Sequence, residues 1–80
     1  MNWHKHIASN PKVLGGKPAV RGTRLAVDFI LGLFAAGWSR EQVLDSYPSL
    51  TPKSLQAVFG YAAEVLKDEA IYPLPAASSK

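Results

Sequence analysis

Residues 39–52, with the sequence SREQVLDSYPSLTP, contain two helix starts separated by a helix stop. The first start is Ser39, followed three residues later by Gln42. This is the spacing of a capping box, in which each side chain bonds the backbone amide of the other residue. The stop is Tyr47-Pro48, because the residue before a proline is biased away from helical backbone angles. We therefore predict a short helix from residue 40 to about residue 46.

The second start is Thr51-Pro52, a hydroxyl-bearing N-cap followed by proline at the first helical position. Beyond it, apolar residues recur at the spacing of one helix face, at Leu55, Val58, Phe59, Ala62 and Leu66. This pattern predicts a helix of about 16 residues that ends near Asp68.

Another helix precedes the quoted stretch. Apolar residues at helical spacing fill much of residues 27–36, and Gly37 stands where a left-handed C-terminal cap belongs. The last two of the three predicted helices have the proportions of a helix-turn-helix motif, although any three-helix bundle contains a similar pair. Six aromatic residues are predicted to pack in the core or between helices: Phe29, Phe34, Trp38, Tyr47, Phe59 and Tyr61.

The first 26 residues are too rich in glycine and proline to form a helix. Short β pieces remain possible there, at Val13-Leu14, Ala19-Val20 and Thr23-Leu25. The predicted fold is mainly α. Its parts are a basic glycine/proline-rich arm or small β-hairpin (1–26), a three-helix helix-turn-helix core (27–69) and a flexible tail (70–80).

The charge is unevenly distributed along the chain. Residues 1–26 carry five cations and no acid, whereas residues 27–80 carry four cations and six acids, which gives the net charge of +3. The N-terminal part of the chain therefore favours an anionic partner such as nucleic acid.

Composition limits the remaining possibilities. A chain of 80 residues is one small domain, and without cysteine it has neither disulfides nor thiolate metal sites. Because so small a core is only marginally stable, we expect a homodimer or larger assembly. No apolar run is long enough to span a bilayer, and the N-terminus does not resemble a secretory signal, so a cytoplasmic location without membrane contact is expected.

No motif for catalysis is apparent. Gly15-Gly16-Lys17 differs from a phosphate-binding loop because prolines occupy positions 11 and 18, where that loop needs glycine and serine or threonine. We expect neither enzymatic activity nor a cofactor or metal.

Two groups of residues are candidates for nucleic-acid binding. In the arm these are Lys17, Arg21 and Arg24. The alternative is that the arm shapes the fold or a dimer interface. One arginine would then pair with an acid of the chain such as Asp28. At the start of the last helix, side chains expected to be exposed are those of Thr51, Lys53, Ser54, Gln56 and Ala57.

In the last helix, a glutamine such as Gln56 can pair with adenine, and Lys53 can bind guanine or phosphate. Thr51 and Ser54 are predicted to bind phosphate, and the alternative is a solvated helix face. In the tail, apolar residues separated by prolines are candidates for binding a partner protein: Ile71, Tyr72 and Leu74.

Residues 7–66 resemble the DUF433 family of small prokaryotic proteins. The resemblance depends on Pro11, Val13-Leu14-Gly15-Gly16-Lys17-Pro18, Arg21-Gly22-Thr23-Arg24, Gly37, Ser39, Tyr47-Pro48, Leu50-Thr51 and Tyr61-Ala62. It implies a homeodomain-like helix-turn-helix antitoxin that binds DNA, regulates its own operon and neutralises a PIN-like ribonuclease toxin. The chain departs from relatives at residues 51–54, where they often carry acids. The alternative function is a protein-binding adaptor with no role on DNA.

Overall fold

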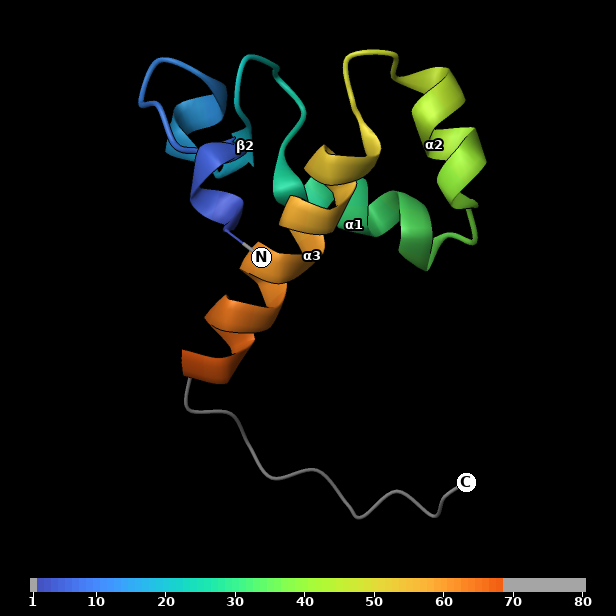
Figure 1. Ribbon diagram of the computed structural model, residues 1–80. Coiled ribbons are helices and arrows are strands. Elements are labelled where there is room, and N and C mark those ends of the chain that lie inside the picture. The colour runs from blue at the N-terminus through green and yellow to red at the C-terminus, as the bar shows by residue number, and fades with distance from the viewer. Residues whose placement is uncertain (1, 69–80) are drawn as a thin grey trace.

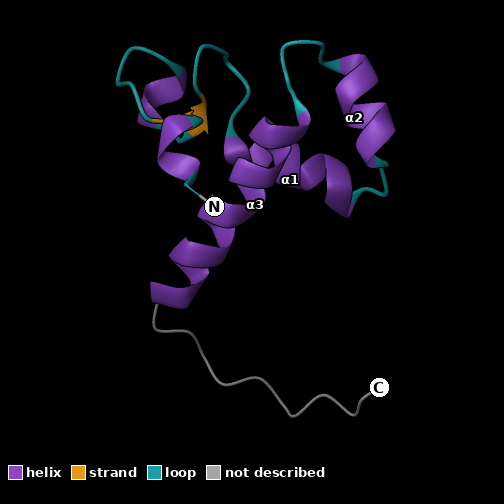
Figure 2. Ribbon diagram, viewed as in Figure 1, coloured by secondary structure: helices purple, strands orange, loops and turns teal. Residues whose placement is uncertain are grey.

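Three helices and a short N-terminal hairpin make up residues 2–68, the part of the chain that this computed structural model describes (Figures 1 and 2). The helices are α1 (Val27–Ala35), α2 (Arg40–Ser46) and α3 (Pro52–Asp68). The hairpin pairs β1 (Ile7–Ala8) antiparallel with β2 (Ala19–Val20). These elements confirm the predicted mainly α fold with three helices after a small β-hairpin. None of the helices within residues 2–68 is both long and apolar enough to cross a membrane.

The ends of α1 and α2 form as the sequence predicts. Gly37, just beyond α1, has a φ of 96°, the left-handed conformation that glycine adopts without strain. At the start of α2, the Ser39 hydroxyl accepts a bond from the Gln42 amide at 3.1 Å. The Gln42 side-chain oxygen in turn accepts from the Ser39 amide at 2.7 Å, which completes the capping box.

The arm differs from the prediction in its strands. Ala19-Val20 is a strand as predicted, but its partner is Ile7-Ala8, and Val13-Leu14 and Thr23-Leu25 are not strands. Residues 14–16 instead form a 3-10 helix, η2 (Leu14–Gly16), whose three residues all have positive φ. Thr23 closes a turn, because its hydroxyl donates to the Val20 carbonyl at 2.8 Å and accepts from the Leu25 amide at 3.0 Å.

The hydrophobic core lies where the three helices and the hairpin meet. Ile30 of α1, Val43 of α2 and Val58 of α3 are fully buried. The prediction that the aromatic residues are core is wrong for Phe29 and Phe59, which are each 45% exposed. The other four are half-buried against the core: Phe34, Trp38, Tyr47 and Tyr61.

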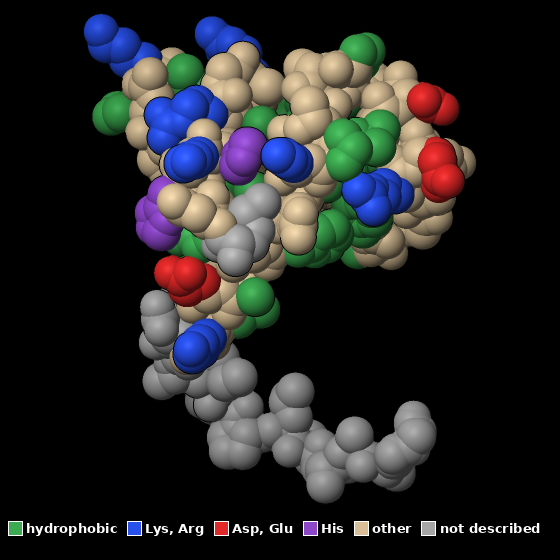
Figure 3. Space-filling view, in the orientation of Figure 1, with side chains coloured by type: hydrophobic (Ala, Val, Ile, Leu, Met, Phe, Trp, Pro, Cys, Tyr) green, Lys and Arg blue, Asp and Glu red, His purple; other side chains and the backbone are tan. Residues whose placement is uncertain are grey.

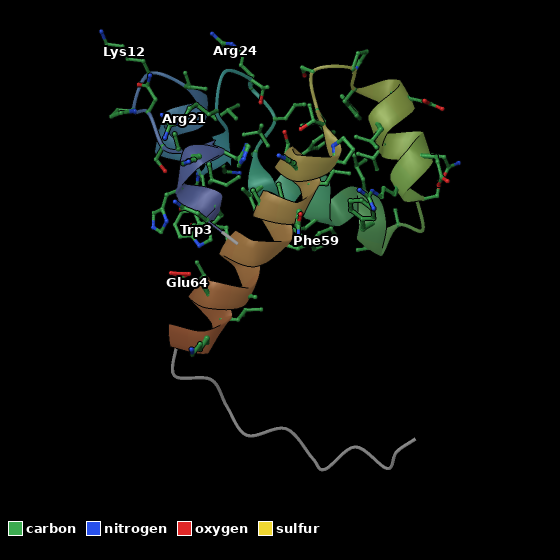
Figure 4. The ribbon with its side chains drawn as sticks, viewed as in Figure 1. Trp3, Lys12, Arg21, Arg24, Phe59 and Glu64 are labelled. Carbon is green, nitrogen blue, oxygen red and sulfur yellow. The ribbon has the colours of Figure 1, made fainter. Side chains whose placement is uncertain are left out.

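The N-terminal segment packs against α3. The Trp3 side chain, on the 3-10 helix η1 (Trp3–Lys5), lies edge-on to Tyr61 with ring centroids 4.9 Å apart. Its indole Nε1 donates to Glu64 Oε1 at 2.9 Å (Figure 4). The predicted arm is therefore folded against the helical core along the side of α3.

Candidate nucleic-acid interface

Three loops lie together at one end of the molecule, opposite the end at which α3 finishes (Figure 1). They are the loop at residues 9–13, the loop at residues 21–25 and the connection between α2 and α3 at residues 47–51. Lys12 and Arg24 extend outward from the first two loops (Figure 4). Since α3 begins directly after the third loop, its first turn and these two cations belong to the same end of the molecule.

Basic side chains gather over the hairpin and its loops on the face shown in Figure 3, whereas acidic side chains lie over α2 and over the C-terminal part of α3. A groove of about 510 Å³ runs between the hairpin loops, and the three predicted arm residues, Lys17, Arg21 and Arg24, all line it. The structure thus brings these three cations together, although each is held differently.

Two of the three cations already have partners within the chain. Lys17 Nζ lies 3.2 Å from Asp28 Oδ2, so Asp28 pairs with the lysine and not with an arginine. The Arg21 guanidinium donates to the backbone carbonyls of His4 at 3.1 Å and Lys5 at 3.3 Å. Arg24 has no ion pair or side-chain hydrogen bond to any other residue in the range 2–67. Of the three, Arg24 is the one whose guanidinium is available to a phosphate.

At the start of α3 the predicted side chains divide between surface and core. Lys53 and Gln56 are exposed, as predicted. The expected exposure of Ser54 and Ala57 is wrong, because Ser54 is 6% exposed and Ala57 is fully buried. The side of α3 that faces the core includes both residues, so Ser54 lacks the exposed hydroxyl that a phosphate contact needs.

The hydroxyls of Thr51 and Ser54 cap the helix. The Thr51 hydroxyl accepts from the Ser54 amide at 3.1 Å, and the Ser54 hydroxyl accepts from the Thr51 amide at 3.3 Å. The two hydroxyl oxygens are 3.0 Å apart and share a further hydrogen bond. The N-cap role predicted for Thr51 is confirmed, and the same bonds occupy the hydroxyl that was a candidate for phosphate binding.

Arg40 is a residue of this surface that the sequence analysis missed. It is the first residue of α2, and it lines a groove of about 360 Å³ together with Gln56 of α3 and the aromatic side chains of Phe34 and Phe59. The only signal in the sequence was its position directly after the Ser39 cap, in the helix before α3. The groove gives Gln56 a cationic neighbour from another helix.

A third groove, which is apolar and has a volume of about 350 Å³, lies between α1 and the C-terminal half of α3, and we call it the α1–α3 groove. Its lining comprises Lys17, Pro18, Val27, Asp28, Leu31, Tyr61, Ala62, Val65 and Leu66. The predicted partner-binding residues of the tail, Ile71, Tyr72 and Leu74, lie outside the described residues. No cluster of possible metal ligands occurs among the residues that the structure does describe.

Comparison with known proteins places the chain in a family. The family described as "Protein of unknown function (DUF433)" matches residues 7–62. The chain is 41% identical over 56 residues to a Sinorhizobium fredii protein described as "Uncharacterized protein y4eO", and the match covers 70% of the chain and 25% of that protein. A similar fold occurs in the crystal structure of a DUF433 member from Anabaena variabilis, with a TM-score of 0.72 and 30% identity.

The structural match covers 76% of the chain and 60% of the Anabaena variabilis protein. The chain thus spans less than two thirds of either relative, and about a quarter of the Sinorhizobium fredii protein. The matched residues include the hairpin, the capped helices and the first half of α3. The chain is a member of the DUF433 family.

Proposed function

We propose that this chain binds double-stranded DNA with the N-terminal half of α3 in the major groove. Support comes first from the order of elements, in which a short helix, a five-residue connection (47–51) and a longer helix follow one another. In a helix-turn-helix, the N-terminal residues of the second helix contact base edges. The residues exposed at that position here, Lys53 and Gln56, have side chains suited to that contact.

The observation that carries the proposal is the shared groove of Gln56 and Arg40. An amide can bond the edge of an adenine bidentately, while a guanidinium beside it can bond the adjoining phosphate and fix the register of the helix. Because Arg40 is the first residue of α2, this arrangement has the first helix of the motif on the DNA backbone and the second on the bases.

The arm supplies cations for flanking phosphates. Arg24 and Lys12 extend from loops at the end of the molecule at which α3 starts (Figure 4). Phosphate contacts provide most of the affinity of such proteins, and each one contributes to the salt dependence. A few cations give one copy only weak affinity, so we expect two copies to bind two half-sites.

The DNA is the operator of the protein's own operon, and the second partner is a PIN-like ribonuclease toxin that this antitoxin-like chain neutralises. This finer part of the proposal follows from the family resemblance. The alternative is a protein-binding adaptor without DNA affinity, which the apolar α1–α3 groove and the exposed Phe29 favour. Neither function requires a cofactor or catalysis.

Fluorescence anisotropy with a labelled duplex from the region upstream of the gene tests DNA binding. The Arg24→Ala variant should weaken binding on every sequence and reduce the salt slope by about one unit. The matched control is Lys67→Ala, which removes the same charge from the far end of α3. If both variants weaken DNA binding equally, the position of the lost charge does not matter. If the wild type does not bind the duplex at low salt, the adaptor function is favoured.

Co-expression with the product of the adjacent gene tests the toxin partner. If that product is a PIN-like ribonuclease, cells that express it alone should stop growing, and this chain should restore growth and copurify with it. Toxicity that persists with the chain present would refute the antitoxin function while leaving DNA binding to be judged by anisotropy.

A further inference from the structure

The apolar face of α3 extends beyond α1, the helix that covers its first part. Leu55 and Val58 are buried, whereas further along the same helix Val65 is 37% and Leu66 is 61% exposed. The reason is geometric, because α1 has 9 residues and α3 has 17. The last turns of α3 therefore project from the body of the molecule (Figure 1).

The projecting turns adjoin the α1–α3 groove. Val65 and Leu66 form one wall of this groove, Leu31 of α1 lies in the opposite wall, and Ala62 lines it with only a methyl group. A ridge of exposed apolar side chains and a hollow of apolar side chains thus lie side by side on one surface. In a two-fold symmetric pair this is self-complementary, because the ridge of each copy enters the hollow of the other.

The charges at the rim fit the same partner. Lys17 and Asp28 both line the groove, form an ion pair with each other and have side chains 60% and 68% exposed. Each copy thus presents one positive and one negative group, and a two-fold copy offers each of them a group of opposite sign. Lys17 and Asp28 are the charged residues that line the groove, so its lining carries no net positive charge to favour nucleic acid.

We propose that a second copy of this chain docks in the α1–α3 groove, with Leu66 of each copy seated in the groove of the other. The pairing gives the last turns of α3 the tertiary packing on which most helices in proteins depend. It also adds apolar burial to a domain whose own core is small. This inference does not rest on the proposed DNA binding, since the contacts involve different surfaces.

Sedimentation equilibrium of the full chain with two matched variants tests the interface. Ala62→Glu places a carboxylate in the groove, whereas Ala63→Glu places the same carboxylate at the next, exposed position of the same helix. The wild type should form dimers within the range of protein concentrations from about 1 to 200 µM. The dissociation constant should rise at least about ten-fold in Ala62→Glu, because an unpaired charge is buried, and should change less than about two-fold in Ala63→Glu.

Circular dichroism separates loss of dimers from loss of fold. If Ala62→Glu does not fold, Leu66→Ser provides the second test, because this side chain is 61% exposed and its replacement leaves the core intact. A folded Leu66→Ser variant that dimerises as tightly as the wild type would overturn the proposal. A wild-type chain that stays monomeric throughout, or equal weakening by Ala62→Glu and Ala63→Glu, would overturn it too.

Discussion

Trp3 and Glu64 are 61 positions apart in the sequence, and a hydrogen bond of 2.9 Å joins the indole Nε1 to the carboxylate. Arg21 extends the same connection, because its guanidinium donates to the His4 and Lys5 carbonyls in the segment that bears Trp3. The N-terminal segment is thus held between α3 and the loop after β2. These contacts hold the N-terminal segment against α3 and hold the loop that carries Arg24 against the N-terminal segment.

Replacement of Trp3 should destabilise the protein in two steps. Trp3→Phe keeps a ring against Tyr61 but removes the N–H donor, and we expect a loss of about 1 kcal/mol in the free energy of unfolding. Trp3→Ala also removes the half-buried ring, for a total of about 2–3 kcal/mol. Urea denaturation measures both. Equal stability of the Phe variant and the wild type would show that the bond to Glu64 contributes nothing.

Arg21 should matter more for the stability of the fold than for binding phosphate through its positive charge. Arg21→Lys keeps the positive charge but loses the planar fork that reaches two carbonyls at once, so the variant should lose about 1–2 kcal/mol of stability. If phosphate binding were the main role of Arg21, the lysine variant would instead keep wild-type stability. Thermal unfolding of Arg21→Lys beside Arg24→Lys gives the comparison, since Arg24 has no partner to lose among residues 2–67.

The cap of α3 should behave as a coupled pair. Thr51→Ala and Ser54→Ala should each cost about 1 kcal/mol, because the first removes the acceptor for the Ser54 amide and the second the acceptor for the Thr51 amide. The double variant should cost less than the sum of the single ones, since the two hydroxyls also bond each other. Lys53→Ala, between them in sequence, should change stability by less than about 0.5 kcal/mol. Strict additivity would contradict the shared hydrogen bonds.

Leu14 should show the effect of its backbone conformation. Its φ of 53° lies in the left-handed region, which costs a residue other than glycine about 1–2 kcal/mol. Leu14→Gly should therefore keep stability within about 1 kcal/mol of the wild type, although it removes a large side chain. Leu14→Val should destabilise by about 2 kcal/mol, because branching at Cβ makes that conformation worse. A valine variant more stable than the glycine variant would show that the backbone at residue 14 is not strained.

The sequence predicts those parts of the fold that neighbouring residues determine. The boundaries of α2 follow from the Ser39 and Gln42 side chains and from Pro48, all within ten residues of one another. The strand Ile7-Ala8 could not be predicted, because no glycine turns flank it as they flank Ala19-Val20, and its pairing with β2 is long-range. The docking of Trp3 on α3 is long-range for the same reason.

The candidate site could be predicted only in part. The apolar pattern of α3 places Phe59 on the core face, but the buried face is turned toward Ser54 and Ala57, so Phe59 is exposed. A period of 3.6 residues shows that one side of a helix is apolar, whereas packing against neighbouring helices decides how the helix is rotated. Arg40 was missed because its proximity to Gln56 depends on how α2 and α3 are arranged.

Base recognition by Gln56 is the central claim, and anisotropy titration of Gln56→Ala on two duplexes tests it most directly. One duplex has the operator sequence and the other the same bases scrambled. The account predicts that the variant keeps its fold, loses about 1–3 kcal/mol on the operator and binds the scrambled duplex as the wild type does. Equal losses on both duplexes, or no loss on either, would contradict it.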